Sequence, residues 1–98
     1  MNIVTNQEDA NLDVRIVGRL DTTTAPQFEQ ELSSQLDGVI NLVLDCSDLE
    51  YISSAGLRVF LGLHKLMTGK GSLQVTNVNE TVMEIFEVTG FDGILDIE

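Results

Sequence analysis

Residues 39–58 read VINLVLDCSDLEYISSAGLR and contain the pattern that decides the fold. Val39–Cys46 is short and nearly all apolar, which is typical of a central strand covered on at least one face. After a turn predicted at Ser47–Glu50, small residues lead into a helix expected from about Ser54 to Met67. A buried strand followed by a helix is one βα unit of an α/β protein. The helix is expected to turn one side inward, made of Leu57, Phe60, Leu61, His64 and Met67.

Before this segment, the sequence predicts a hairpin. Leu12, Val14 and Ile16 are spaced two apart, which is the period of a strand. Asn2–Thr5 is the expected hairpin partner, joined through a polar turn at Gln7–Asn11.

Residues 22–38 predict the first helix. Thr24 as N-cap places Gln27 at the capping-box position, and Pro26 falls in the first turn, where its missing N–H costs little. Gly38 is expected to close the segment. The apolar positions at helical spacing are Ala25, Phe28, Leu32 and Leu36.

After the central helix, strand and helix alternate once more. Thr68–Gly71 reads as a loop, and Ser72–Val78 alternates as a strand. Asn79 can cap a third helix, which Gly90 terminates. That helix carries Val82, Met83, Ile85 and Phe86, and the tail that follows has apolar residues with which to dock: Phe91, Ile94, Leu95 and Ile97.

The order of elements predicts an α/β fold. An opening hairpin followed by βα units gives a mixed β-sheet with right-handed crossovers and helices packed mainly on one face. The 98 residues, of which 43% are hydrophobic, suffice for one domain over residues 1–98. With no Trp and five aromatic residues, the core must consist mainly of Leu, Ile and Val.

The charge narrows the possible partners. Five basic and sixteen acidic residues give a formal charge of -11, which repels nucleic acid and anionic membranes. A basic partner fits, although the acidity can also serve solubility alone. No transmembrane run or signal-peptide pattern is present, so we expect a cytoplasmic protein, and monomer is the default state.

The residues offer no candidate for catalysis, metal binding or a cofactor. His64 is the sole histidine, and one helix would separate it from Ser54 by roughly 15 Å, so the two cannot form a nucleophile and base. One His and one Cys give no metal-ligand cluster. Cys46 is expected to be a small buried core residue, and Gly69-Lys70-Gly71 a turn rather than a phosphate loop.

The small residues Ser53-Ser54-Ala55-Gly56 at the predicted helix start allow two interpretations. Either serine can be an ordinary N-cap without further function. Alternatively, the lack of bulk at Ala55 and Gly56 lets another protein approach a serine whose helix N-terminus favours a phosphate dianion. Gly56 costs up to about 1 kcal/mol of helix propensity against Ala, so it needs a packing or access reason.

Four motifs in order give the chain a family resemblance. They are Gly18-Arg19-Leu20-Asp21-Thr22-Thr23-Thr24-Ala25, Leu42-Val43-Leu44-Asp45-Cys46-Ser47-Asp48-Leu49, Tyr51-Ile52-Ser53-Ser54-Ala55-Gly56-Leu57-Arg58 and Val88-Thr89-Gly90-Phe91. Over essentially its whole length the chain resembles the anti-sigma factor antagonists, bacterial proteins that consist of a single STAS domain. That family often has Asp directly before its accepting serine, where this chain has Ser53.

The resemblance implies a phosphorylation switch and no enzyme activity. The unphosphorylated antagonist binds an anti-sigma serine kinase of the histidine-kinase-like ATPase fold and frees the sigma factor. Phosphorylation of the serine, here Ser54, blocks binding, and a PP2C-type phosphatase resets the switch. The predicted partner-binding residues are Asp21, Thr22, Ser53, Ser54, Ala55, Gly56 and Arg58. The alternative is a STAS module that regulates a different partner, such as a transporter or a stress-signalling scaffold.

Overall fold

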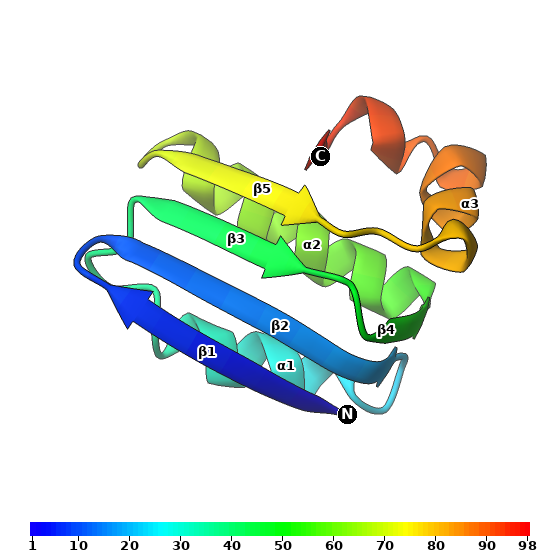
Figure 1. Ribbon diagram of the computed structural model, residues 1–98, viewed down its shortest axis with the longest axis horizontal. Coiled ribbons are helices and arrows are strands. Elements are labelled where there is room, and N and C mark those ends of the chain that lie inside the picture. The colour runs from blue at the N-terminus through cyan, green and yellow to red at the C-terminus, as the bar shows by residue number, and fades with distance from the viewer.

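The computed structural model describes residues 1–98 and confirms the α/β class with an opening hairpin. Figure 1 shows the elements in chain order. They are β1 (Asn2–Glu8), β2 (Asn11–Leu20), α1 (Ala25–Ser33), β3 (Asn41–Asp45), β4 (Leu49–Ile52), α2 (Ser54–Thr68), β5 (Ser72–Thr76), α3 (Glu80–Thr89), the 3-10 turn η1 (Phe91–Gly93) and β6 (Asp96–Ile97). None of the helices is long and apolar enough to cross a membrane.

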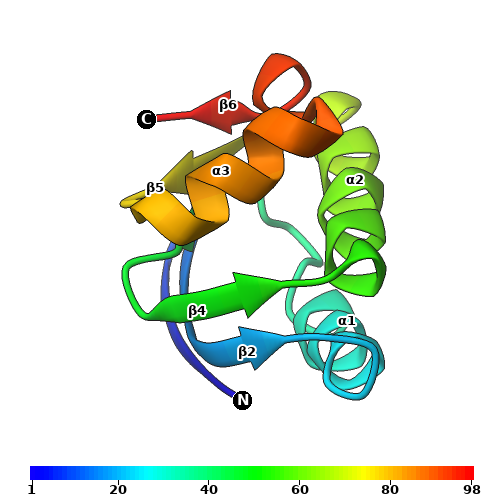
Figure 2. The same ribbon diagram turned by 90° about the vertical axis from the view of Figure 1, so that its right-hand side faces the viewer.

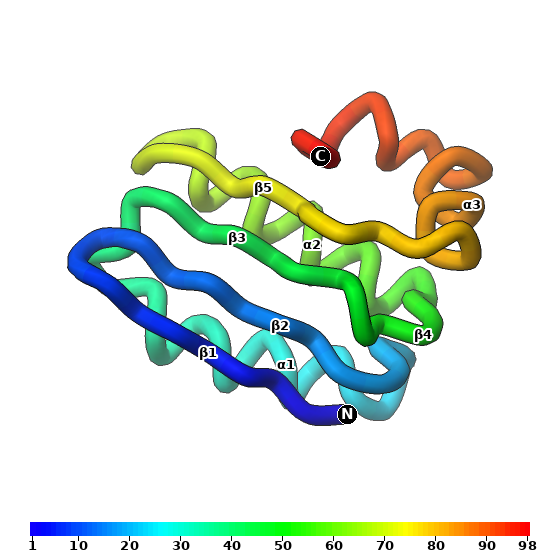
Figure 3. Tube along the Cα trace, in the orientation of Figure 1, coloured from blue at the N-terminus to red at the C-terminus, as the bar shows by residue number.

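The sheet is mixed, as expected. Its order is β1-β2-β3-β5-β6, with β4 paired to β2, and only the β1–β2 pair is antiparallel. The Cα trace in Figure 3 shows β2, β3 and β5 running alongside one another. Helices α1 and α2 lie behind the sheet, so their connections are right-handed crossovers, while α3 sits at one end (Figure 1).

The core lies between the sheet and helices α1 and α2. Leu12, Leu42 and Leu73 stand side by side on β2, β3 and β5, all 5% exposed or less. A row of rings crosses the helices: Phe28 and Phe60 have centroids 6.3 Å apart, and Phe60 and Phe86 6.2 Å. Because α1, α2 and α3 each contribute one ring, this row joins all three helices in one core.

Two strands differ from the prediction. The turn expected at Ser47–Glu50 ends at Asp48, and the unpredicted strand β4 begins at Leu49. Strand β3 pairs only with Asn11–Arg15 of β2, so the last part of β2 is free to pair with β4. The tail docks as expected and adds β6 beside β5. The hairpin is confirmed with a tighter turn, since β1 runs on to Glu8 and only Asp9 and Ala10 remain outside the strands.

The helices confirm some predicted boundaries and correct others. Asn79 caps α3 and Gly90 ends it at φ +81°, as predicted. By contrast, α1 ends at Ser33, and Leu36 is buried from the turn that follows rather than from the helix. The loop before β3 uses Gly38 at φ +80°, a conformation suited to glycine.

The predicted inner side of α2 is partly wrong. Leu57, Phe60 and Met67 are buried, but Leu61 and His64 are only half-buried. Val59 and Leu63 fill the inner face in their place. Helix α2 packs against both the sheet and α1. Its buried face is therefore wider than the single apolar stripe that the sequence predicts, and it is rotated toward Val59 and Leu63.

Candidate functional site

The ends of β2 and β4 bring two distant sequence motifs together. Leu20 pairs with Ile52, and the Ser53 amide donates to the Leu20 carbonyl at 2.9 Å. Asp21 and Ser53, which follow these paired residues, therefore leave the sheet side by side. Figure 2 looks onto this end of the molecule, where α1 and α2 both begin.

The structure decides which serine caps α2. Ser53 is the N-cap in an extended conformation, and its hydroxyl oxygen accepts from the Gly56 amide at 3.4 Å. Its carbonyl accepts from the Leu57 amide at 2.9 Å. Ser54 is the first residue of the helix and is exposed. The capping interpretation therefore applies to Ser53, and the exposed Ser54 has no capping role.

Gly56 has a packing reason rather than an access reason. A Cβ at Gly56 would lie 2.8 Å from Ile52 Cγ1 and 3.0 Å from both Leu20 Cγ and the Leu20 carbonyl oxygen. Gly56 is buried, so it has no side chain to offer a partner. Its role in the predicted surface is to let the first turn of α2 sit directly on the ends of β2 and β4.

Asp21 organises the start of α1, which corrects the predicted capping box. Its Oδ1 accepts from the amides of Thr23 (3.0 Å) and Thr24 (3.1 Å), and its carbonyl accepts from the Ala25 amide. The hydrogen bond from the Thr24 amide is the largest cause that lowers the pKa of Asp21, and the Thr23 amide adds to it.

Thr24 is the N-cap residue of α1, but its side chain makes no capping hydrogen bond. Thr24 Oγ1 instead accepts from the Asp21 amide at 2.9 Å and lies 2.9 Å from the Arg19 carbonyl oxygen. Gln27, expected to complete the box, donates to Glu31 one turn later. The loop hydrogen bonds to Asp21 thus replace the predicted reciprocal pair.

Arg58 lies one turn beyond Ser54 on the exposed side of α2. A shallow hollow between α1 and α2 is lined there by Ala25, Pro26, Glu29, Ala55, Arg58 and Val59. Thr22 is exposed in the loop after Asp21, and Ala55 is half-buried. Six of the seven predicted site residues therefore retain exposed surface at one end of the molecule, and Gly56 lies beneath them.

Sequence reasoning assigned no role to Arg19 and Tyr51, which the structure places beside this site. The Arg19 guanidinium carbon lies 4.5 Å from the centre of the Tyr51 ring, a cation–π contact. The pair forms because Arg19 on β2 and Tyr51 on β4 are opposite one another in register. Since the predicted turn at Ser47–Glu50 took in the first half of β4 and no strand was expected there, no sequence signal placed the two residues together.

The side chains considered for catalysis or phosphate binding have other places in the fold. His64 lies ten positions further along α2, as predicted, which corresponds to roughly 15 Å of helix. Cys46 is fully buried, and burial raises the pKa of its thiol to about 12. Lys70, in the turn once compared with a phosphate loop, donates to the Leu36 carbonyl at 2.9 Å.

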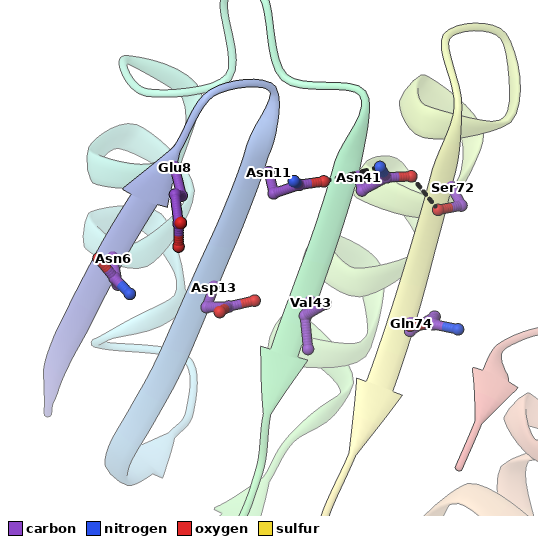
Figure 4. Close-up of a pocket in the computed structure, with 8 residues that line it drawn as sticks. All are labelled: Asn6, Glu8, Asn11, Asp13, Asn41, Val43, Ser72 and Gln74. Atoms are coloured by element: carbon purple, nitrogen blue, oxygen red, sulfur yellow. Dashed lines mark hydrogen bonds between the residues drawn. The ribbon is translucent and has the colours of Figure 1, made fainter.

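A second hollow lies on the sheet face that carries no helices. It has a volume of about 450 Å³ and polar walls apart from one valine, formed by Asn6, Glu8, Asn11, Asp13, Asn41, Val43, Ser72 and Gln74 (Figure 4). Asn41 donates to Asn11 at 2.7 Å and accepts from Ser72 at 2.9 Å. These bonds link the beginnings of β2, β3 and β5, at the opposite strand ends from Asp21 and Ser53.

Solved structures define the class of protein to which this fold belongs. The unphosphorylated form of the anti-sigma factor antagonist SpoIIAA matches with a TM-score of 0.84 and 18% identity, over 99% of this chain and 88% of that one. The phosphorylated form of the Bacillus cell fate determinant SpoIIAA matches with a TM-score of 0.75 and 17% identity, over 99% and 91%. The chain therefore has the fold of the SpoIIAA-like proteins.

The family model for the STAS domain matches residues 2–98, so the chain belongs to the STAS domain family. It is 31% identical over 98 residues to the anti-sigma-B factor antagonist of Bacillus subtilis strain 168, covering 99% of this chain and 90% of that protein. The resemblance drawn from the four motifs is confirmed, and the relatives are named as regulators rather than as enzymes.

Proposed function

We propose that this chain is an anti-sigma factor antagonist whose unphosphorylated form binds an anti-sigma serine kinase and frees a sigma factor. Phosphorylation of Ser54 blocks that binding. The observation that carries the proposal is that the two serines differ in role: Ser53 caps α2, while Ser54, the next residue, is exposed and takes no part in the cap.

The helix geometry supports Ser54 as a phosphate acceptor. The kinase would transfer the γ-phosphoryl group of ATP to Ser54 Oγ, leaving ADP and a proton, and a PP2C-type phosphatase would hydrolyse the ester. At the first position of α2, the unpaired N–H groups and the helix dipole favour the dianion. Arg58, four positions on, can reach the phosphate from the next turn. The modification is therefore expected to leave the fold intact.

Phosphate on Ser54 is expected to weaken binding of the partner rather than to change the fold. Phosphate adds about -1.5 to -2 charges at pH 7 to a protein whose formal charge is already -11. On the proposed contact surface of Asp21, Thr22, Ser53, Ala55 and Arg58, it would occupy the space that the kinase needs. The kinase also holds nucleotide phosphates near its own site, so like charges would be brought together.

The test is mass spectrometry of the protein after incubation with the anti-sigma serine kinase of the same organism and ATP. We expect one phosphate on Ser54 in the wild type and none in Ser54→Ala. Ser53→Ala is the matched control: it removes the neighbouring hydroxyl at a cost of about 1 kcal/mol of capping, and it should still be phosphorylated. Phosphate on Ser53, or on neither serine, would refute the assignment.

A further inference from the structure

A shallow apolar groove lies between α3 and β4, away from the residues assigned above. It has a volume of about 350 Å³ and is lined by Tyr51, Thr81, Glu84, Ile85, Val88 and Thr89; we call it the α3–β4 groove. Val88 is 83% exposed, more than any other large hydrophobic residue of the chain. An exposed apolar side chain beside an aromatic ring is typical of the residues that anchor protein–protein interfaces.

The groove is held in place before any partner arrives. Arg19 stacks on Tyr51 from the far side of β4, and Val82 and Phe86 anchor α3 in the core. The Asn79 side-chain Nδ2 donates to the Leu49 carbonyl at 2.6 Å, which ties the start of α3 to β4. Because these contacts fix both walls, a ligand would not have to order the groove.

The groove lies close to Ser54 along the chain. Tyr51 precedes Ser54 by three residues, a path of about 10 Å in extended chain. A typical interface buries about 800 Å² on each partner, or about 32 Å across as a disc. The end of the molecule that Figure 2 faces measures only 26 by 19 Å between Cα atoms. An interface of this size centred on Ser54 would therefore reach the groove.

The charges around the groove indicate the chemistry of its occupant. Glu84 lines it, and Glu80 and Glu87 are exposed on the same helix, which has no basic residue. No basic residue lines the groove, and Arg19 is engaged with the Tyr51 ring. An aliphatic side chain accompanied by a positive charge complements both the apolar lining and the acidic rim.

We propose that the α3–β4 groove binds an aliphatic side chain of the anti-sigma kinase, flanked by a lysine or arginine that pairs with Glu84. The inference rests on the proposed function and adds a second contact region to the one around Ser54. Val88 is the anchor position on this chain, and phosphorylation of Ser54 leaves the groove itself unchanged.

The test is calorimetric titration of the unphosphorylated protein with the anti-sigma kinase, using Val88→Lys. We expect at least a tenfold weaker Kd, because the substitution removes the apolar contact and opposes the basic flank. Leu66→Lys is the matched control, since it adds the same charge at another exposed apolar residue, 48% exposed, near the far end of α2. It should bind within twofold of the wild type. Sedimentation of both variants checks folding and self-association.

The outcomes separate the two proposals. If the wild type binds the kinase and Val88→Lys binds equally well, the groove is not a contact region, while the proposed function stands. If the wild type does not bind the kinase at all, both proposals fall. If the wild type dimerises and Val88→Lys abolishes the dimer without weakening kinase binding, the groove belongs to a second copy of the chain and the inference is overturned.

Discussion

Gly56 shows how closely the first turn of α2 approaches the strands beneath it. In Gly56→Ala the new Cβ would meet Ile52 Cγ1 at 2.8 Å and Leu20 at 3.0 Å. Overpacking of this kind costs about 1–3 kcal/mol, which exceeds the gain of up to about 1 kcal/mol in helix propensity. We therefore expect the free energy of unfolding to fall by about 1–2 kcal/mol, measured by urea denaturation.

The control for this substitution lies in the same helix. Gly62 is exposed in α2, and a Cβ there would have nothing within 4 Å. Gly62→Ala should therefore stabilise the protein by about 0.5–1 kcal/mol through helix propensity alone. Equal effects of the two substitutions would show that the close contact at Gly56 does not constrain the helix.

The lowered pKa of Asp21 predicts how the free energy of unfolding depends on pH. Its pKa is lowered from 3.8, chiefly by the hydrogen bond from the Thr24 amide, so the folded state favours the ionised carboxyl more than the unfolded state does. A lowered folded pKa contributes stability above 3.8 that is lost as the pH falls through the folded value. Asp21→Asn should therefore show a shallower loss of unfolding free energy on acidification below that pH.

The measurement is urea denaturation across the acidic range, together with an NMR titration of the Asp21 carboxyl. Asp13→Asn removes one carboxylate from the exposed face of β2 without touching the loop before α1, and it serves as the control. An Asp21 pKa at or above 3.8 by NMR would contradict the role assigned to its hydrogen bonds.

Among the elements, α3 depends on one residue that performs two tasks. Asn79 Oδ1 accepts from the Val82 amide at 3.0 Å, and Asn79 Nδ2 donates to the Leu49 carbonyl at 2.6 Å. Asn79→Asp keeps the acceptor and loses the donor, whereas Asn79→Ala loses both. We expect Asn79→Ala to cost about 2 kcal/mol and Asn79→Asp to cost less.

Hydrogen exchange distinguishes the two tasks of Asn79. In Asn79→Asp the first amides of α3 should remain protected, because the cap acceptor is present, while protection of β4 falls. In Asn79→Ala protection should fall in both elements. Loss of α3 protection in both variants would show that the bond to Leu49, and not the cap, holds the helix.

The elements also show what sequence could predict. Asn79 and Gly90 were found because Asn caps and left-handed glycine are local signals, and α2 was found because its pattern is long. β4 was missed because four residues after a polar turn carry no clear period, and its existence depends on the free edge of β2. A strand created by a distant partner has no local signature.

The same reasoning applies to the candidate site. Its sequence motif correctly placed Ser53 and Ser54 at a helix start, but the motif could not decide which serine caps the helix. The capping box at Thr24 failed because Asp21, three residues earlier, accepts from the Thr24 amide that Gln27 was expected to bond, while the Thr24 hydroxyl bonds within the loop. The contact of Arg19 with Tyr51 required the register of β2 against β4, which only the folded chain supplies.

For the whole molecule, the formal charge of -11 predicts opposite effects of salt on folding and on partner binding. The Debye length is about 30 Å at 0.01 M salt and about 10 Å at 0.1 M. The molecule measures 33 by 26 by 19 Å, so at low salt nearly all of its carboxylates repel one another. Raising NaCl from 0.01 to 0.1 M should therefore raise Tm, by about 4–8 °C if the screened repulsion is on the order of 1 kcal/mol.

Binding of a basic kinase should weaken over the same range of salt, because screening reduces the attraction that speeds association. Thermal unfolding followed by circular dichroism measures the first effect, and the association rate by stopped flow measures the second. A triple variant, Glu80→Gln, Glu84→Gln and Glu87→Gln, removes three exposed negative charges from α3 and should reduce both salt effects. If Tm falls with NaCl while binding strengthens, the excess carboxylates neither destabilise the folded state nor attract the partner.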